Sequence, residues 1–362
     1  MTKKVALGMS GGVDSSTSVK ILQEQGYEVH GVYLAGLYPG AKQEAAITDV
    51  KRVAEELKIS WEVVDLGAKP QLLYDYFVET YRQGRTPNVC TICNAQIKFG
   101  WFYQWALSQG FDYVATGHYA RLQKKADNGW QLKTAVDESK DQTYFLALVD
   151  EDVWARVLFP VGAYRKTEIR QLTAKWQLPV AEKKESMEVC FLQDQKVKAF
   201  LQERIQSKPG EIVWKQGDKL IKVGNHQGLA FYTLGQRQGV PIEPITDMMP
   251  ALYVIAKEVD TNRLIVGEEK DLGLQIINCV SPSKRLKKSL IEGENYSSWR
   301  VRIRHRGELI TIKEIKQVNQ EHWQVTLKTK ARAPAPGQFA VFYEPNAKED
   351  ESWLVVGAAE MV

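Results

Sequence analysis

The sequence predicts an α/β protein: a doubly wound parallel sheet, then a small central β domain and a C-terminal β-barrel-like domain. In the first half, short apolar strand segments alternate with segments of helical period, as in parallel sheets. After about residue 209 the pattern changes to short strands separated by turn signals, such as those at 216–218 and 260–262. These observations divide the 362 residues into domains at 1–209, 210–273 and 274–362.

The expected elements of the first half follow from local patterns. Strands are predicted at 4–7, 27–34, 61–66 and 113–115, where apolar residues cluster. A helix should open after Gly12, and a second carries Ala46, Val50, Val53 and Leu57 at helical spacing. Two more are predicted over 70–83, beginning with a proline in its first turn, and over the aromatic-rich 97–108. A sheet of this class binds ligands beyond the carboxyl ends of its strands.

The second half contains one strand with an unusual face. Between Trp299 and Arg306, apolar residues alternate with arginines, so one face of a strand would be wholly arginine. Pro334, Pro336 and Gly337 should interrupt a later strand pair, and no strong helix is expected in this half. Residues 276–345 carry 13 Lys and Arg against 6 Asp and Glu, although the whole chain has a net charge of only +4. This imbalance suggests a polyanionic partner, while a solvated lysine-rich surface would give the same count.

Composition indicates an ordinary globular protein of the cytoplasm. Hydrophobic residues make up 44% and charged residues 25% of the chain. No apolar run reaches the length needed to cross a bilayer, and the N-terminal apolar stretch is too short for a signal peptide. Four cysteines in a chain of this length do not form a disulfide framework, so we expect them to be free, metal-bound or catalytic.

A phosphate-binding loop is predicted at residues 10–16 (SGGVDSS), between the first strand and the first helix. The two glycines allow close approach of a ligand, and the helix N-terminus presents unpaired N–H groups to an anion. Ser10 and Ser15 add hydroxyl donors, and Asp14 can hold a magnesium ion. No Gly-Lys-Ser/Thr follows, so the loop is not of the Walker type. It resembles the PP-loop of ATP pyrophosphatases, which cleave ATP to AMP and pyrophosphate. A simple glycine turn opening a helix is the structural alternative.

The cysteines suggest sulfur or metal chemistry. Cys90 and Cys93 form a Cys-x-x-Cys pair in an expected loop, a spacing shared by redox pairs, zinc sites and iron–sulfur sites. Cys190 follows the charged stretch 182–185, whose lysines would favour its thiolate. Cys279 lies in an apolar strand context and is expected in the core. A structural zinc site remains the alternative, although no second pair completes a familiar zinc spacing.

Taken together, the separated motifs resemble the tRNA-specific 2-thiouridylase family of the PP-loop ATP pyrophosphatase superfamily, which has a HUP-like fold. The resemblance covers nearly the whole chain and rests on residues 8–15, 84–88, 93–94 with 97–99, 115–120, 140–142, 187–191, 231–237 and 336–338.

The resemblance implies roles for particular residues. The target would be the wobble uridine of tRNAs for Lys, Glu and Gln. Cys190 would carry a persulfide received from a cysteine desulfurase or relay protein, and Cys93 would be its catalytic partner. ATP would contact Gly8, Met9, Ser10, Gly11, Gly12, Val13, Asp14, Ser15, Leu34 and Gly117. The tRNA would contact Asn88, His118, Lys140, Asp141, Gln142, Arg304, His305 and Gln338.

One departure from the family pattern changes the chemistry that we expect. Many relatives have Asp where this chain has Cys90. Cys90, Cys93 and Cys190 could therefore hold a [4Fe-4S] cluster with one open iron site carrying exogenous sulfide, and three soft ligands favour this option over a persulfide. Segment 35–48 also lacks the acidic stretch of many relatives, so contacts to a sulfur donor are not transferred there.

Two other functions fit part of the sequence. A small-molecule adenylating ligase of the same loop class would need neither three cysteines nor an arginine-faced β domain. A catalytically silent RNA-binding protein would not need an intact phosphate loop. Both therefore explain less than a tRNA thiolase that uses ATP and magnesium.

Overall fold

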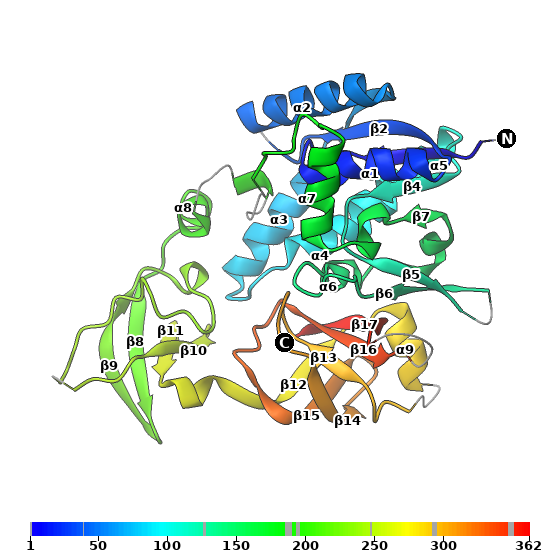
Figure 1. Ribbon diagram of the computed structural model, residues 1–362. Helices are drawn as coiled ribbons and strands as arrows, with labels where there is room; N and C mark the ends of the chain where they lie inside the picture. The colour runs from blue at the N-terminus through cyan, green and yellow to red at the C-terminus, as the bar shows by residue number, and fades with distance from the viewer. Residues whose placement is uncertain are drawn as a thin grey trace. The chain divides into compact units, whose positions relative to one another are not determined.

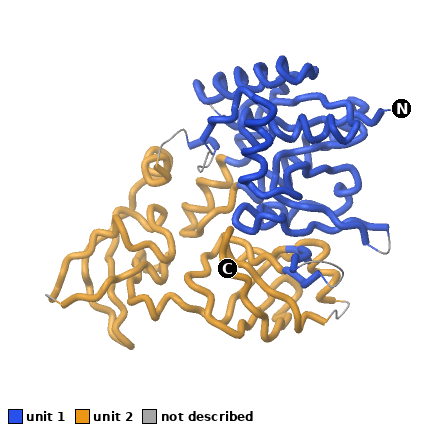
Figure 2. The backbone as a smooth tube through the Cα atoms, in the orientation of Figure 1, with its two compact units in different colours: residues 1–73, 90–194, 343–357 blue, residues 74–89, 195–342, 358–362 orange. Residues whose placement is uncertain are grey.

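The computed structural model describes residues 2–38, 40–125, 128–184, 190–192, 196–246, 248–291, 295–346 and 351–362. Within the motifs above, residues 185 and 187–189 lie outside the described residues. The chain forms two compact units, coloured in Figure 2. Unit 1 comprises residues 1–73, 90–194 and 343–357, and unit 2 comprises residues 74–89, 195–342 and 358–362.

Unit 1 is built on a five-stranded parallel sheet, as predicted. Its strand order is β3-β2-β1-β4-β7, so the order reverses between β1 and β4. Val5, Ala6 and Leu7 of β1 are fully buried because helices cover the sheet. The strands are β1 (Lys4–Gly8), β2 (Glu28–Ala35), β3 (Ser60–Asp65), β4 (Tyr113–Thr116) and β7 (Val157–Leu158).

The helices of the first half are α1 (Val13–Glu24), α2 (Ala41–Leu57), α3 (Lys69–Arg82), α4 (Val89–Cys93), α5 (Tyr103–Ser108), α6 (Thr143–Leu146) and α7 (Lys166–Lys175). Helices α1, α2 and α3 agree with predicted segments, whereas α4, α6 and α7 were not predicted. Pro70 lies in the first turn of α3, where its missing N–H is tolerated. Helices α1 and α7 lie side by side, joined by a 2.8 Å hydrogen bond between the buried Thr17 and Thr173 hydroxyls (Figure 1).

The Cys-x-x-Cys segment and the aromatic helix after it differ from the prediction. Cys90 and Cys93 lie in α4, not in a loop, and the chain continues without interruption as a π-helix over Asn94–Phe102. The wider turn requires Gly100, since a Cβ there would lie 2.8 Å from the carbonyl oxygen of Ala95, five residues earlier. The α-helical period assumed for 97–108 therefore fails up to residue 102. Such π segments occur frequently at functional sites.

Unit 1 also contains an antiparallel hairpin, β5 (Arg121–Lys124) with β6 (Trp130–Lys133). β6 pairs with β17 (Trp353–Met361) at Leu354, so the unit takes up a segment from near the end of the chain. Short 3₁₀ helices lie at Glu151–Arg156, Pro160–Ala163 and Cys190–Leu192.

The second half of the chain contains two β structures. One is a four-stranded sheet of order β10-β11-β8-β9. The other is a closed barrel, since the order β12-β15-β14-β13-β16-β17 returns to β12 through a β12–β17 pairing. This closure confirms the predicted barrel. The strands are β8 (Gly210–Gln216), β9 (Lys219–His226), β10 (Tyr253–Glu258), β11 (Arg263–Gly267), β12 (Gly273–Val280), β13 (Arg300–Arg302), β14 (Ile310–Gln317), β15 (His322–Arg332) and β16 (Phe339–Pro345).

Two expectations for the second half are wrong. The arginine strand is only three residues long, and the chain turns after Arg302, with Arg306 in the left-handed region at φ 58°. Its apolar face is nevertheless buried as predicted, at Trp299, Val301 and Ile303. A helix also occurs where none was expected, α9 (Lys284–Ile291) in the barrel domain. Helix α8 (Val197–Gln202) lies before residue 209 and outside that expectation. In α9 the lysines dominate the composition and mask the helical period of its apolar residues.

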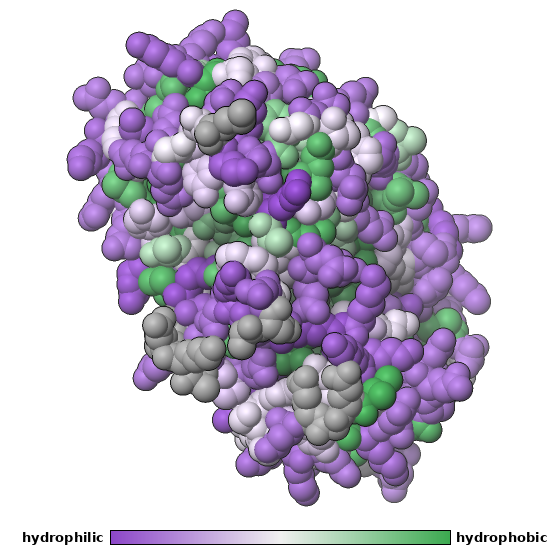
Figure 3. Space-filling view, turned by 90° about the vertical axis from the view of Figure 1, so that its right-hand side faces the viewer, coloured by the Kyte–Doolittle hydropathy of each residue, from purple (hydrophilic) through white to green (hydrophobic). Residues whose placement is uncertain are grey.

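The surface in Figure 3 is largely hydrophilic, with apolar residues in small scattered areas. Within the described ranges, no helix has the length and apolar character that a membrane crossing requires.

Candidate functional site

The phosphate loop lies at the carboxyl end of β1, next to the carboxyl end of β4, where the strand order reverses. Gly117 follows β4 and approaches the loop closely: a Cβ there would lie 2.8 Å from the backbone nitrogen of Ser15. Gly11 has φ 68° and meets α2, because its Cβ would lie 2.7 Å from the carbonyl oxygen of Ala46. The predicted loop residues and Gly117 are thus brought together at the position where such sheets bind ligands.

The Ser15 side chain fixes the conformation of the loop backbone. The Ser15 hydroxyl accepts the backbone N–H of Ser10 at 3.2 Å and lies 3.2 Å from the carbonyl oxygen of Gly12, to which it donates. Gly12 is the N-cap of α1 in an extended conformation and has no side chain to cap the helix. The first turn of α1 can therefore direct its N–H groups to an anion. Met9 and Leu34 are buried beside the loop at the ends of β1 and β2.

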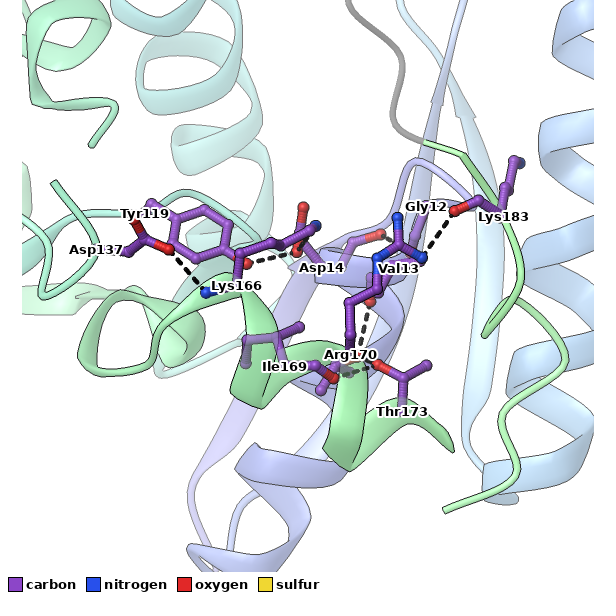
Figure 4. A network of polar contacts seen from close by, with 12 residues as sticks. Gly12, Val13, Asp14, Tyr119, Asp137, Lys166, Ile169, Arg170, Thr173 and Lys183 are labelled. Carbon is purple, nitrogen blue, oxygen red and sulfur yellow. Dashed lines mark hydrogen bonds and ion pairs between the residues drawn. The ribbon is translucent and has the colours of Figure 1, made fainter. Parts of the chain in front are cut away.

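Asp14 is the centre of a polar network in the first turn of α1 (Figure 4). Its Oδ1 accepts from the Lys166 ammonium at 2.6 Å and from the Tyr119 hydroxyl at 2.8 Å. The Lys166 side chain is only 10% exposed, and its nitrogen lies 5.7 Å from the centre of the Tyr119 ring. The carboxylate predicted to hold magnesium is therefore also the partner of a buried cation.

A second lysine supports the loop from the other side. The Lys183 ammonium donates to the carbonyl oxygen of Gly11 at 2.9 Å and pairs with Asp49 of α2 at 2.5 Å. Arg170 of α7 donates to the carbonyl oxygens of Ala181 and Lys183. This segment was expected to activate Cys190, and the structure shows the Lys183 ammonium engaged with the loop.

Three of the four cysteines lie near one another in unit 1, and none is disulfide-bonded. Cys90 is exposed, Cys93 is buried and Cys190 is half-buried. Burial raises the pKa of Cys190 to about 12, with further contributions from the neighbouring Cys93 and Cys90. Lys98 of the π-helix opposes this shift and acts in the same sense on Cys93. Lys98 is thus the cation that favours thiolates here.

Two tyrosines border the same cysteines. Burial raises the pKa of Tyr38 well above its usual value, an effect to which Cys190 adds, and the pKa of Tyr33 rises for the same two reasons. Burial and the neighbouring acidic groups therefore favour the protonated forms of Tyr33, Tyr38 and Cys190.

The cysteines do not form a ready cluster site. Across the residues that the structure describes, no three His, Cys, Asp or Glu side chains are arranged to hold a metal ion. Cys90 is exposed at the surface of α4, whereas Cys93 points into the core. As placed in the structure, Cys90, Cys93 and Cys190 therefore do not fit a three-cysteine cluster. Cys279 is fully buried in β12, as predicted.

The residues assigned to tRNA fall into several environments. His118 is buried, bonded to Thr116 at 2.7 Å and 3.5 Å from the Lys98 ammonium, and burial lowers its pKa well below the usual value. Asp141 is 3% exposed, and its carboxylate accepts from the backbone of Ala135 and the Thr143 hydroxyl. Through these contacts Asp141 connects the backbone at Ala135 to the start of α6.

The remaining residues assigned to tRNA are less buried than His118 and Asp141 or are bonded to each other. Gln142 accepts the backbone N–H of Tyr119, and Lys140 is half-buried. In unit 2, Asn88 donates to Gln338 at 3.3 Å, and Gln338 donates to the carbonyl oxygens of Thr86 and Pro87. Arg304 is exposed in the turn after β13, next to His305. Burial and the flanking arginines lower the pKa of His305 to about 4.

Three family models match successive stretches of the chain. The model described as "tRNA methyl transferase HUP domain" matches residues 3–194. A "tRNA methyl transferase PRC-barrel domain" matches 198–268, and an "Aminomethyltransferase beta-barrel domain" matches 278–352.

Curated relatives agree over almost the full length. A protein named "tRNA-specific 2-thiouridylase MnmA" from Treponema denticola is 36% identical, with 94% of each chain covered. One of the same name from Carboxydothermus hydrogenoformans is 37% identical, again over 94% of each chain. The chain belongs to the tRNA-specific 2-thiouridylase family. Within this 2-thiouridylase, the phosphate loop and the three cysteines all occupy the HUP domain match.

Sequence reasoning missed several residues of this site. Lys98 was noted only as part of a motif, and Lys166 and Tyr38 were not noted at all. Lys166 lies 152 positions from Asp14 in the chain, so no local pattern joins them. Lys98 was in principle detectable, since a lysine among the aromatic residues 97–105 is unusual for a buried helix.

The raised pKa of Cys190 predicts how its reactivity depends on pH. A raised pKa means that the thiol keeps its proton to higher pH, so the rate of alkylation by iodoacetamide should rise by about tenfold per pH unit from 7 to 10. Removing the cation in Lys98→Met should slow the reaction at each pH, whereas Lys51→Met on exposed α2 should not. Mass spectrometry of the Cys190 peptide measures these rates, and a plateau below pH 9 in the unmodified protein would contradict the prediction.

Proposed function

We propose that this protein thiolates C2 of the wobble uridine in tRNAs for Lys, Glu and Gln, in an ATP-dependent reaction in the cytoplasm. The observation that carries this proposal is the combination, within unit 1, of a phosphate loop and a group of three neighbouring cysteines. The family membership over 94% of the chain supports it. A small-molecule adenylating ligase would use the loop but leaves the cysteines without a role.

Activation of the base is the first step of the proposed reaction. The C2 oxygen of uridine attacks the α-phosphate of ATP, the bond to the β-phosphate breaks, and pyrophosphate leaves. The poor leaving group at C2 thereby becomes AMP, a good one. The loop N–H groups and the α1 N-terminus would bind the phosphates. Asp14, a carboxylate in the first turn of α1, fits the need of a magnesium ion for one or two protein carboxylates besides phosphate oxygens, and magnesium would supply charge neutralisation there.

Sulfur transfer is the second step. The terminal sulfur of a persulfide on Cys190 attacks C2, and AMP leaves. The Cys93 thiolate then attacks the Cys190 sulfur, which releases the 2-thiouridine and forms a Cys93–Cys190 disulfide. A two-electron thiol reductant must reopen this disulfide before a donor, a cysteine desulfurase or relay protein, reloads Cys190. Lys98, which favours the thiolates of both cysteines, would assist each attack.

The tRNA must present its wobble base splayed out of the anticodon loop, because sequence-specific RNA enzymes act on unstacked bases. Arg300, Arg302 and Arg304 would contact phosphates that position the RNA without reading its sequence. The half-buried Arg300 and Arg302 and the exposed Arg304 support this role. Asn88, held against Gln338, would lie at the base, since its amide can bond a pyrimidine edge.

The activation step is tested by changing the loop. Asp14→Ala and Ser10→Ala should abolish AMP formation from ATP in the presence of tRNA. Circular dichroism checks that each variant is folded, and a lower melting temperature is expected for Asp14→Ala because it leaves the Lys166 ammonium without its carboxylate partner. Wild-type AMP release in both variants would refute the ATP pyrophosphatase mechanism. Nucleoside mass spectrometry of tRNA from cells with and without the gene identifies the modified base, and unchanged 2-thiouridine would refute the function itself.

Cys90 separates the persulfide route from a cluster. In the persulfide route Cys90→Ala should keep most of its thiolation activity, whereas Cys93→Ala and Cys190→Ala should lose it, and Cys279→Ala is the matched control. The protein should be purified without oxygen, its iron and sulfide measured, and each variant assayed with a persulfide donor. Bound iron and sulfide that all three variants lose, together with loss of activity, would establish the cluster instead.

The arginine turn predicts a salt effect. Replacing Arg300, Arg302 and Arg304 by Ala should weaken tRNA binding and reduce the slope of log affinity against log salt by about 0.7 for each RNA phosphate that the variant no longer neutralises. Replacing Lys215, Lys219 and Lys222 of the other sheet removes equal charge and serves as the control. Filter binding at several salt concentrations measures the slopes, and equal slopes for the two triple variants would mean that this face is merely solvated.

A further inference from the structure

The phosphate loop contains no cation of its own. Residues 8–16 (GMSGGVDSS) include one carboxylate and no lysine or arginine. Binding of a triphosphate in proteins generally combines backbone N–H groups with a positively charged side chain, which also neutralises the charge that develops on the leaving group. Since the loop would bind a polyanion beside the carboxylate of Asp14, a cation has to come from elsewhere in the fold.

Lys166 brings a cation to this position. Its ammonium lies 2.6 Å from Asp14 Oδ1, and Asp14 follows directly after the loop residues Gly12 and Val13. Phosphate oxygens bound by the first turn of α1 would therefore come within reach of the same ammonium. Tyr119 donates to the same carboxylate oxygen, and its ring lies near the ammonium, so both the acid and the lysine are fixed in place (Figure 4).

The backbone at Lys166 is equally well fixed. Its N–H donates to Asp137 Oδ2 at 2.9 Å, and the other carboxylate oxygen, Oδ1, accepts from the Ser139 hydroxyl at 2.6 Å. Lys166 is the first residue of α7, which is joined to α1 through Thr17 and Thr173. The helix that carries the lysine and the helix that follows the loop thus form one support, which is the preorganisation that phosphoryl-transfer sites require.

We propose that Lys166 is the phosphate-binding cation of this site, contacting the β- or γ-phosphate of ATP and stabilising the pyrophosphate that leaves. Asp14 and Tyr119 are positioning residues that hold the ammonium at the loop. If the ion pair only held α7 against α1, the loss of Lys166 would change the affinity for ligands with and without phosphates to the same extent. The proposal rests on the use of ATP proposed above.

The test compares ligands that differ in their phosphates. By calorimetry with magnesium, Lys166→Met should weaken binding of ATP and of inorganic pyrophosphate on the order of 10- to 100-fold, the loss expected for a hydrogen bond to a charged group. Binding of adenosine should change by less than about twofold, since it offers no phosphate. Lys166→Arg should recover part of the affinity for both phosphate ligands, and Lys175→Met, at the exposed end of α7, should bind like the unmodified protein.

Each result has one interpretation. Equal losses for adenosine and ATP, or unchanged pyrophosphate binding in Lys166→Met, would overturn the proposal, because the lysine would then be only structural. Melting temperatures identify a variant that does not fold, and Lys166→Arg then provides the comparison, with weaker pyrophosphate binding than the unmodified protein but equal adenosine binding as the expected result. If the unmodified protein binds neither ATP nor pyrophosphate, the proposed function fails together with this inference, an outcome distinct from a failure of Lys166 alone.

Discussion

The close approach of two backbones, after β1 and after β4, is the constraint on which the site depends. Only a hydrogen atom fits at Gly117, because a Cβ would lie 2.8 Å from Ser15 N and 3.0 Å from the Asp14 carbonyl carbon. The next residues, His118 and Tyr119, are thereby brought to the start of α1. Tyr119 reaches Asp14, and Asp14 in turn holds Lys166. The absence of a Cβ at Gly117 therefore allows the chain after β4 to place Tyr119 at Asp14, and Asp14 to hold the Lys166 ammonium beside the loop.

A different constraint governs the protonation of the cysteines: forming a thiolate in a partly buried site costs free energy. Burial keeps the Cys190 and Cys93 thiols protonated, and mutual repulsion makes a second thiolate more costly than the first. Lys98 offsets part of this cost from the π-helix, where it also lies beside the neutral His118. A site of this kind protects its sulfur from oxidants at rest, because the thiolate is the reactive form.

The sequence was most informative where chemistry is local. Strand β1, the glycine loop and the α1 helix are contiguous, so their order alone predicts an anion site, and the alternation of Trp299, Val301 and Ile303 predicts a buried face that the structure confirms. The π-helix could not be predicted, since its period depends on the Gly100–Ala95 approach. The bond between Lys183 and the carbonyl oxygen of Gly11 could not be predicted, because the two residues are 172 positions apart in the chain. Lys166 could not be found because tertiary packing of α7 on α1 brings it to Asp14.

The discontinuity of unit 1 limits how the protein can be divided. Residues 343–357 belong to this unit, where Tyr343 lies against Thr143, Glu344 accepts from Gln131 and Asn346 bonds Gln123. A fragment ending near residue 194 would lack all three interactions and the strand that pairs with β6 at Leu354. It would expose a sheet edge with unsatisfied N–H and C=O groups, a template for self-association. During synthesis, the strand that pairs with β6 is made about two hundred residues after β6 itself. The unit that carries the loop therefore cannot complete its folding before the barrel strands have been synthesised.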